Sequence, residues 1–136
     1  MDERMTGGEL WTVRTGLGLP RSALGRRLGV REDTVKAWEI GKERIPVRVR
    51  GEVEALEAYT AGAVGDLVDA LNAARDVAVE VYRSDADMPA DRADVRQLGA
   101  SWWRMVVFRA ALEVPGVEIG TRAELDARAE DGECGD

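Results

Sequence analysis

Residues 19–45 read LPRSALGRRLGVREDTVKAWEIGKERI and decide how the N-terminal half of the chain folds. Leu24 and Leu28 lie four positions apart, a spacing that predicts a short helix with one apolar face. Gly29 stands where this helix has to end, because glycine readily adopts the left-handed conformation at a helix C-terminus. The first part of the stretch therefore predicts a short helix that stops at Gly29.

A second helix is predicted from about Arg31 to Glu39, and Gly41 ends it. Its apolar side has the spacing of a buried face, formed by Thr34, Val35 and Trp38. Val30 falls into the angle between the two helices. Two helices joined by a tight turn that contains glycine are typical of the helix-turn-helix motif, whose second helix enters the major groove of DNA.

These residues also carry a family resemblance. The stretch around residues 8–58 resembles the Cro/CI-like (XRE) helix-turn-helix family. The matching positions are Leu19, Leu24, Gly25, Leu28, Gly29, Val30, Thr34, Val35, Trp38, Glu39 and Gly41. In this family an arginine of the first helix often pairs with the glutamate of the W-E-x-G motif, and Arg14 and Glu39 hold those places here.

The chain departs from the family pattern at three helix-start positions. Pro20 and Arg31 replace the usual serine or threonine caps, and Arg21 replaces a glutamine that usually touches a phosphate. A proline at a helix start is tolerated, because the N–H that it lacks would have no partner there. The resemblance implies a DNA-binding surface that consists of Arg21, Ser22, Arg31, Glu32, Asp33, Lys36, Ala37, Lys42 and Arg44.

Two parts of that surface have a second interpretation. Glu32 and Asp33 can accept a hydrogen bond from a cytosine amine, or they can simply be favourable negative charges at a helix N-terminus. Lys42 and Arg44 can contact phosphates, or they can belong to a solvated basic loop.

The charge is divided unevenly along the chain. The net charge of the whole chain is −7, which by itself argues against DNA binding, but the two halves of the chain carry opposite net charges. From Arg14 to Arg50 there are ten basic and four acidic residues, a net charge of +6. From Ala61 to Asp136 there are eight basic and sixteen acidic residues, a net charge of −8. Affinity for nucleic acid depends on the local field, so the positive segment favours it.

The composition argues against an enzyme, a metal centre and a bound cofactor. The chain has no histidine and one cysteine, Cys134, so it cannot form a Cys/His zinc site or a nucleophile–histidine pair. No apolar run reaches the roughly 18 residues of a membrane span, and MDERMTGG lacks an apolar signal segment. We therefore expect a cytoplasmic, nucleoid-associated protein that does not bind membranes.

The other helices of the N-terminal half have simpler signals. The Thr6-Gly-Gly-Glu9 spacing is that of a capping box, which predicts a helix that starts after Thr6. A further helix begins at Pro46 and buries Val49, Val53 and Leu56. The glycines within residues 59–65 predict a weak point, followed by another helix over about residues 65–74.

The pattern changes after residue 76. Val77, Val79 and Val81 alternate with Ala78, Glu80 and Tyr82, which predicts a strand with one apolar face. A polar loop over residues 84–91 leads to a long helix predicted over residues 91–112. Residues 117–119 are a second, short strand candidate. From Gly120 onward the acidic chain is expected to be disordered.

This order of elements is similar to that of anti-CRISPR-associated and YdiL-like repressors, in which a C-terminal α/β extension makes the dimer. The expected fold is mainly α: a helix-turn-helix domain of four to five helices over residues 1–60, an α/β dimerisation extension over 61–119, and a tail over 120–136. Short strands with exposed edges favour pairing across a two-fold axis. The expected dimer residues are Val77, Val79, Val81, Trp102 and Trp103.

Trp102 and Trp103 have two interpretations. Aromatic side chains can hold unpaired bases. They also fill cores and interfaces, and adjacent residues on a helix point about 100° apart. We therefore expect Trp102 to fill the core and Trp103 to meet a partner subunit or the first domain.

The sequence thus predicts a homodimeric repressor of phage or mobile-element type that binds double-stranded DNA at an inverted repeat. An antitoxin-like module with a toxin-type protein partner and autoregulatory DNA binding is the main alternative. RNA binding through the same basic face is the third.

Overall fold

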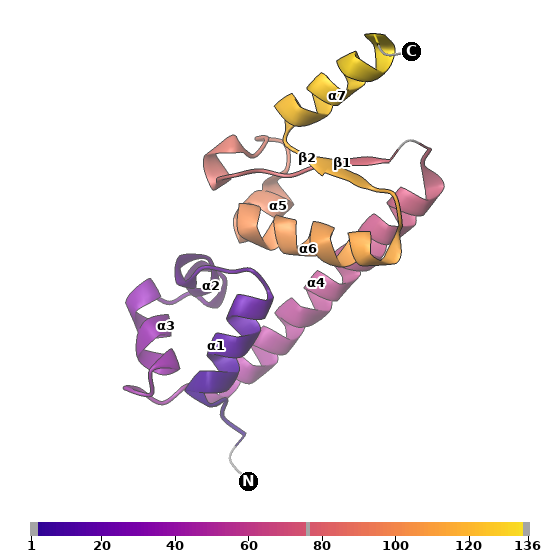
Figure 1. The fold of residues 1–136 in the computed structure, drawn as a ribbon. Coiled ribbons are helices and arrows are strands. Elements are labelled where there is room, and N and C mark those ends of the chain that lie inside the picture. The colour runs from indigo at the N-terminus through magenta and orange to yellow at the C-terminus, as the bar shows by residue number, and fades with distance from the viewer. Residues whose placement is uncertain (1–2, 76, 135–136) are drawn as a thin grey trace.

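The structure, a computed structural model, describes residues 3–75 and 77–134. This part of the chain is mainly helical with one two-stranded sheet, which confirms the expected fold class at this coarse level. In Figure 1 the first three helices gather at one end of a long helix, α4, and the later helix α6 packs against its other half. None of the described helices is both long and apolar enough to cross a membrane.

The ends of the first three helices are set by local chemistry. These helices are α1 (Gly7–Gly16), α2 (Arg21–Leu28) and α3 (Glu32–Glu39). The predicted capping box is present at α1: the Thr6 hydroxyl accepts from the Glu9 backbone N–H, and the Glu9 carboxylate accepts from the Thr6 N–H, both at 3.0 Å. Gly29 ends α2 with a φ of 72°, and only residues 29–31 join α2 to α3.

The helix α4 (Val47–Ala73) is continuous over 27 residues. The predicted weak point at residues 59–65 and the separate helix after it are therefore wrong. Gly62 and Gly65 each cost the helix about 1 kcal/mol relative to alanine. Each buried aliphatic side chain contributes about 1.5–3 kcal/mol, so packing outweighs that cost. The buried residues that run through the stretch are Val49, Val53, Leu56, Thr60, Val64 and Leu71.

The long helix predicted over residues 91–112 is interrupted. It consists of two helices, α5 (Ala93–Leu98) and α6 (Ala100–Glu113). Between them Gly99 has a φ of 100°, which residues with a side chain rarely adopt. Asp85 of the short 3-10 helix η1 (Asp85–Asp87) accepts a hydrogen bond from the Ala100 backbone N–H at 2.8 Å. This bond satisfies a free donor at the start of α6 and so favours two helices over one.

The sheet consists of two three-residue strands. Strand β1 (Ala78–Glu80) runs parallel to β2 (Glu118–Gly120), with Val79 opposite Ile119. The chain passes through α5 and α6 between them, because parallel neighbours need a crossover connection. Both strands lie where strands were predicted, although β1 is shorter than the predicted residues 77–82.

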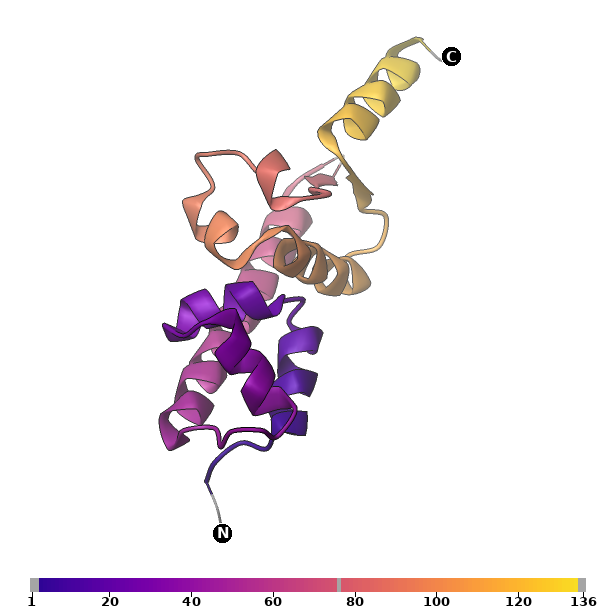
Figure 2. The ribbon, with the colours of Figure 1, turned by 90° about the vertical axis from the view of Figure 1, so that its left-hand side faces the viewer.

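Residues 122–134 form a helix, so the prediction of a disordered tail from Gly120 onward is wrong. The helix α7 (Arg122–Cys134) projects away from the body of the molecule in Figures 1 and 2. Its start repeats the capping arrangement of α1. The Thr121 N–H donates to the Glu124 carboxylate at 2.8 Å, and the Thr121 hydroxyl accepts from the Glu124 N–H at 3.4 Å.

The buried apolar side chains of both halves belong to one cluster. The predicted domain boundary between residues 60 and 61 falls inside α4. The indole N–H of Trp102 in α6 donates to the buried Thr60 hydroxyl at this point, at 3.0 Å. Ser101 of α6 also donates to the carbonyl of Gly18, beyond the end of α1. The N-terminal helices are therefore tied to the C-terminal half by direct contacts.

Candidate nucleic-acid interface

Helix α3 has an apolar inner face and a polar outer face. Val35 and Trp38 are buried, with 0% and 4% of their surface exposed. Ala37 is half-buried. The outer residues that the resemblance assigns to base reading are exposed: Glu32, Asp33 and Lys36. Most of the predicted base-reading residues are thus accessible from outside.

The N-terminus of α3 has no side-chain cap. Arg31 occupies the N-cap position, is exposed and makes no capping hydrogen bond. Glu32 and Asp33 lie in the first turn, where a negative charge is worth about 0.3–1 kcal/mol against the helix dipole. This favourable charge needs no DNA, so both interpretations of the two acids stay open.

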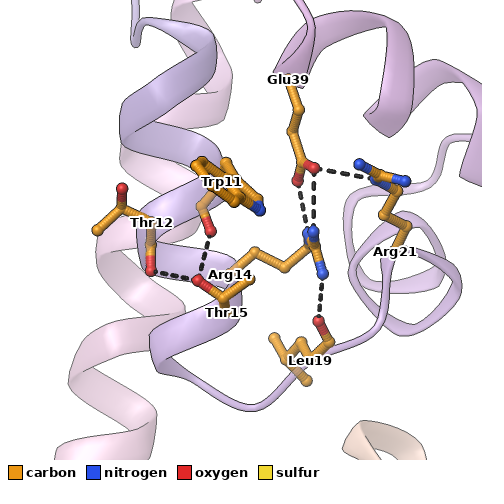
Figure 3. A network of polar contacts seen from close by, with 7 residues as sticks. All are labelled: Trp11, Thr12, Arg14, Thr15, Leu19, Arg21 and Glu39. Atoms are coloured by element: carbon orange, nitrogen blue, oxygen red, sulfur yellow. Dashed lines mark hydrogen bonds and ion pairs between the residues drawn. The ribbon is translucent and has the colours of Figure 1, made fainter.

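Glu39, at the end of α3, connects this helix to α1 and α2 (Figure 3). Its carboxylate accepts two hydrogen bonds from Arg14, at 2.5 Å from Nε and 3.0 Å from Nη2. Arg21 Nε donates to the same carboxylate at 2.9 Å. The Glu39 side chain is only 2% exposed and that of Arg14 10%. The network is therefore buried, and its paired oxygens fix the orientation of α3.

Arg14 also holds the connection between α1 and α2. Its Nη1 donates to the Leu19 carbonyl at 2.9 Å, so one guanidinium joins α1, this connection and α3. Arg21 was expected to contact a phosphate, yet its Nε is directed at Glu39 and its side chain is only 32% exposed. The structure thus gives Arg21 a structural role that nothing in the sequence indicated.

Two glycines let the backbones of this region approach closely. A Cβ atom on Gly7 would lie 2.5 Å from the Glu39 carbonyl oxygen, and one on Gly25 would lie 2.7 Å from that of Val30. Such distances do not occur for real side chains, so these positions require glycine. Gly25 belongs to the family pattern, whereas the contact of Gly7 had no signal in the sequence beyond its place at a helix start.

Six of the ten basic residues between positions 14 and 50 have no carboxylate partner in the described part of the chain. They are Arg26, Arg27, Arg31, Lys36, Lys42 and Arg44. Lys42 and Arg44 are exposed in the loop between α3 and α4. These cations can attract an anion without first breaking an ion pair.

Ser22 is the remaining residue predicted to contact DNA, and Ile40 is a neighbour of this surface that was not predicted. Ser22, in the first turn of α2, is half-buried. Ile40 directly follows α3 and is 62% exposed, which is unusual for a large apolar side chain. Its place off the stripe of Val35 and Trp38 was the only signal for it in the sequence.

Three of the five residues predicted at a dimer interface are buried within the chain itself. Val79, Trp102 and Trp103 are 6%, 1% and 9% exposed. The indole N–H groups are also used internally, by Thr60 and by the Glu80 carbonyl. The partly buried Val77 and Val81 pack against the same core. The two tryptophans and Val79 are therefore core residues of the single chain, which confirms the expectation that Trp102 fills the core, and none of the three offers an exposed surface to a partner.

No protein-family model matches the chain, and no curated protein is significantly similar to it. Within the described ranges, no three acidic, histidine or cysteine side chains come together as ligands for a metal ion.

Proposed function

We propose that this protein is a sequence-specific DNA-binding transcriptional repressor of the Cro/CI-like (XRE) type. The observation that carries the proposal is the outer face of α3 with its N-cap, where Lys36 and Arg31 are exposed and form no ion pair within the described residues, while Glu39 at the other end of α3 is held by Arg14. In this proposal α2 and α3 form the helix-turn-helix, and α3 enters the major groove.

The unpaired cations supply the electrostatic part of binding. Each phosphate that a cation neutralises releases condensed counterions, which drives association at low salt. The segment from Arg14 to Arg50 carries +6 although the chain carries −7, so the attraction is confined to this end of the molecule. Lys42 and Arg44 follow α3 directly and are the proposed phosphate contacts.

Base recognition falls to the outer residues of α3. Lys36 can donate to the O6 and N7 acceptors of guanine, and Glu32 or Asp33 can accept from the N4 amine of cytosine. A site that reads bases mainly with these three side chains favours an operator half-site containing G·C pairs.

The proposed repressor acts as a dimer, and the face available for a second copy is on α6. Phe108 and Leu112 lie one turn apart and are 62% and 71% exposed. Arg109 and Glu113 lie beside them and are also exposed. In an antiparallel pair of α6 helices, Arg109 of one copy lies near Glu113 of the other. The charges of this face are therefore complementary to those of a second copy.

The test is a selection of fragments from the source genome that bind the purified full-length chain. Sequencing should recover an inverted repeat with half-sites about 34 Å apart, or a multiple of that distance. Transcribed RNA from the same genome serves as the competing pool. Enrichment of RNA over duplex DNA, or of no common motif, would overturn the proposal.

A further inference from the structure

A pocket of about 460 Å³ lies between the middle of α4 and the helices α5 and α6. Its volume falls in the range of about 300–1,000 Å³ that is typical of small-molecule sites. The pocket is separate from the outer face of α3. The proposed DNA contacts therefore do not account for it.

Three aromatic side chains line this pocket. Tyr59 of α4 is 42% exposed and stacks on Trp102, with ring centroids 6.1 Å apart and an angle of 26° between the planes. Trp103 lies beside Trp102 on α6. Rings that already stack with one another can accept a further planar ring, at an offset or edge to face.

The pocket also holds one cation and one anion. The Arg92 guanidinium lies 4.9 Å from the centre of the Trp103 ring, and Asp66 of α4 also lines the pocket. Within the described residues neither side chain forms an ion pair, with the other or with any third group. Two opposite, unpaired charges beside aromatic rings match a ligand that carries both charges and a ring.

Gly62 of α4 lines the pocket and contributes no side chain to its wall. A Cβ atom at this position would meet no other atom within 4 Å, so packing does not require glycine there. Glycine inside a helix is less favourable than alanine. Gly62 is thus a position where a larger side chain can fill the pocket without disturbing the core.

We infer that this pocket binds a zwitterionic small molecule with a planar aromatic ring, about the size of an aromatic amino acid. The ring stacks in the aromatic pocket, the carboxylate of the ligand meets Arg92, and its ammonium group meets Asp66. Binding of this ligand does not depend on the proposed DNA-binding function.

The pocket is linked to the N-terminal helices through Tyr59. The guanidinium of Arg27, on α2, lies 5.6 Å from the centre of the Tyr59 ring. A ligand that stacks on Tyr59 therefore contacts the same ring that forms the cation–π contact with Arg27. If the chain binds DNA as proposed, ligand binding in the pocket then changes the surroundings of Arg27 on α2.

The experiment is isothermal titration calorimetry of the full chain, without DNA, against three probes that share one ring. L-tryptophan carries both charges, tryptamine carries only the amine, and indolepropionate carries only the carboxylate. A charged hydrogen bond is worth about 1.5–3 kcal/mol, so L-tryptophan should bind at least about tenfold more tightly than either of the others.

Substitutions then locate the site. Gly62→Leu should fill the pocket and abolish binding, whereas Gly65→Leu, at an exposed glycine of the same helix that does not line the pocket, should bind like wild type. Both variants should melt no lower than wild type. Asp66→Asn should remove the preference over indolepropionate, and Arg92→Gln the preference over tryptamine.

Three results would overturn the inference. The first is no heat of binding for any probe at millimolar concentration. The second is equal affinity for all three probes, which would show that the charges do not matter. The third is unchanged binding in folded Gly62→Leu, which would place the ligand elsewhere.

Discussion

The Arg14 guanidinium donates two hydrogen bonds to the Glu39 carboxylate, at 2.5 and 3.0 Å, although the two residues are 25 positions apart in the chain. Each is the other's main charged partner in a site nearly closed to water. Because α1 carries one of them and α3 the other, the pair sets the angle at which the outer face of α3 is presented. Loss of this pair should therefore affect stability and DNA binding together.

Glu39→Ala should destabilise the fold strongly. It leaves the buried Arg14 without a counter-charge, a defect that typically costs roughly 3–5 kcal/mol. The total stability of a small domain is only about 5–15 kcal/mol. Glu39→Gln should lose less, because it keeps the shape and one acceptor oxygen. Urea denaturation of both variants measures the difference.

The matched control is Glu52→Ala. Glu52 pairs with Arg48 on the surface of α4, where the two side chains are 44% and 51% exposed. Such pairs are worth about 0–1 kcal/mol. Equal losses in Glu39→Ala and Glu52→Ala would show that the pair between α1 and α3 is not buried in solution.

Lys36→Ala and Arg44→Ala should weaken DNA binding in different ways. If Lys36 contacts a base, its loss should cost about 1–3 kcal/mol on the operator and little on random duplexes. Loss of a phosphate contact at Arg44 should weaken all duplexes alike and reduce the salt slope by about one unit. Fluorescence anisotropy at several salt concentrations separates the two effects.

Arg128→Ala is the control for these two variants. It removes one positive charge from α7, where Arg128 is 65% exposed and lies only 3.8 Å from Glu118. Its DNA affinity should equal that of wild type. If all three variants lose affinity equally, net charge rather than a defined contact surface governs binding.

Phe108→Glu should convert a dimer of this chain into monomers. The change places a charge on the exposed apolar face of α6 that we propose to pair with itself. Trp11→Glu is the matched control, since Trp11 is a large apolar residue of α1 that is 57% exposed. Sedimentation of wild type as a monomer at micromolar concentration would refute the dimer, and dissociation by Trp11→Glu would move the interface to α1.

Elements whose ends are marked by nearby residues were predictable from the sequence. Thr6 caps the start of α1 and Gly29 ends α2, and each depends only on residues a few positions away. These two helix ends therefore lie where they were expected. Elements that depend on distant partners were not. The break at Gly99 needs the carboxylate of Asp85, and the continuity of α4 needs packing of residues such as Thr60 against Trp102.

The candidate site divides in the same way. The family resemblance placed Arg14 opposite Glu39, but nothing in the sequence indicated that Arg21 would join them. The helix α7 was missed for a different reason. The acidic composition of this segment predicts disorder, whereas Thr121 and Glu124 have the same helix-capping spacing as Thr6 and Glu9. The aromatic pocket has no local signal, because its walls come from α4, α5 and α6.

The two capping boxes predict a dependence of stability on pH. The backbone N–H of Thr6 holds the pKa of Glu9 below its usual 4.5, and that of Thr121 does the same for Glu124. A carboxyl whose pKa is lowered by folding stabilises the fold above its unfolded pKa, and this stabilisation is lost as the pH falls through the folded pKa. Glu9→Gln should therefore melt below wild type at neutral pH and approach it below pH 4.5. A constant difference between the two proteins at every pH would mean that the charge of Glu9 plays no part.

The hydrogen bond from Trp102 to Thr60 should be visible in a double-mutant cycle. The Trp102 N–H reaches the Thr60 hydroxyl at 3.0 Å, and that hydroxyl donates to the Leu56 carbonyl at 2.8 Å, with Thr60 0% exposed. Thr60→Val keeps the shape but leaves a buried indole N–H without a partner, which costs about 1–3 kcal/mol. In the Trp102→Phe background no such N–H remains, so the same change should cost clearly less, a coupling of about 0.5–3 kcal/mol. Urea denaturation of the four proteins gives this coupling directly. Equal costs of Thr60→Val in the two backgrounds would mean that the tryptophan does not join α6 to α4 through this bond.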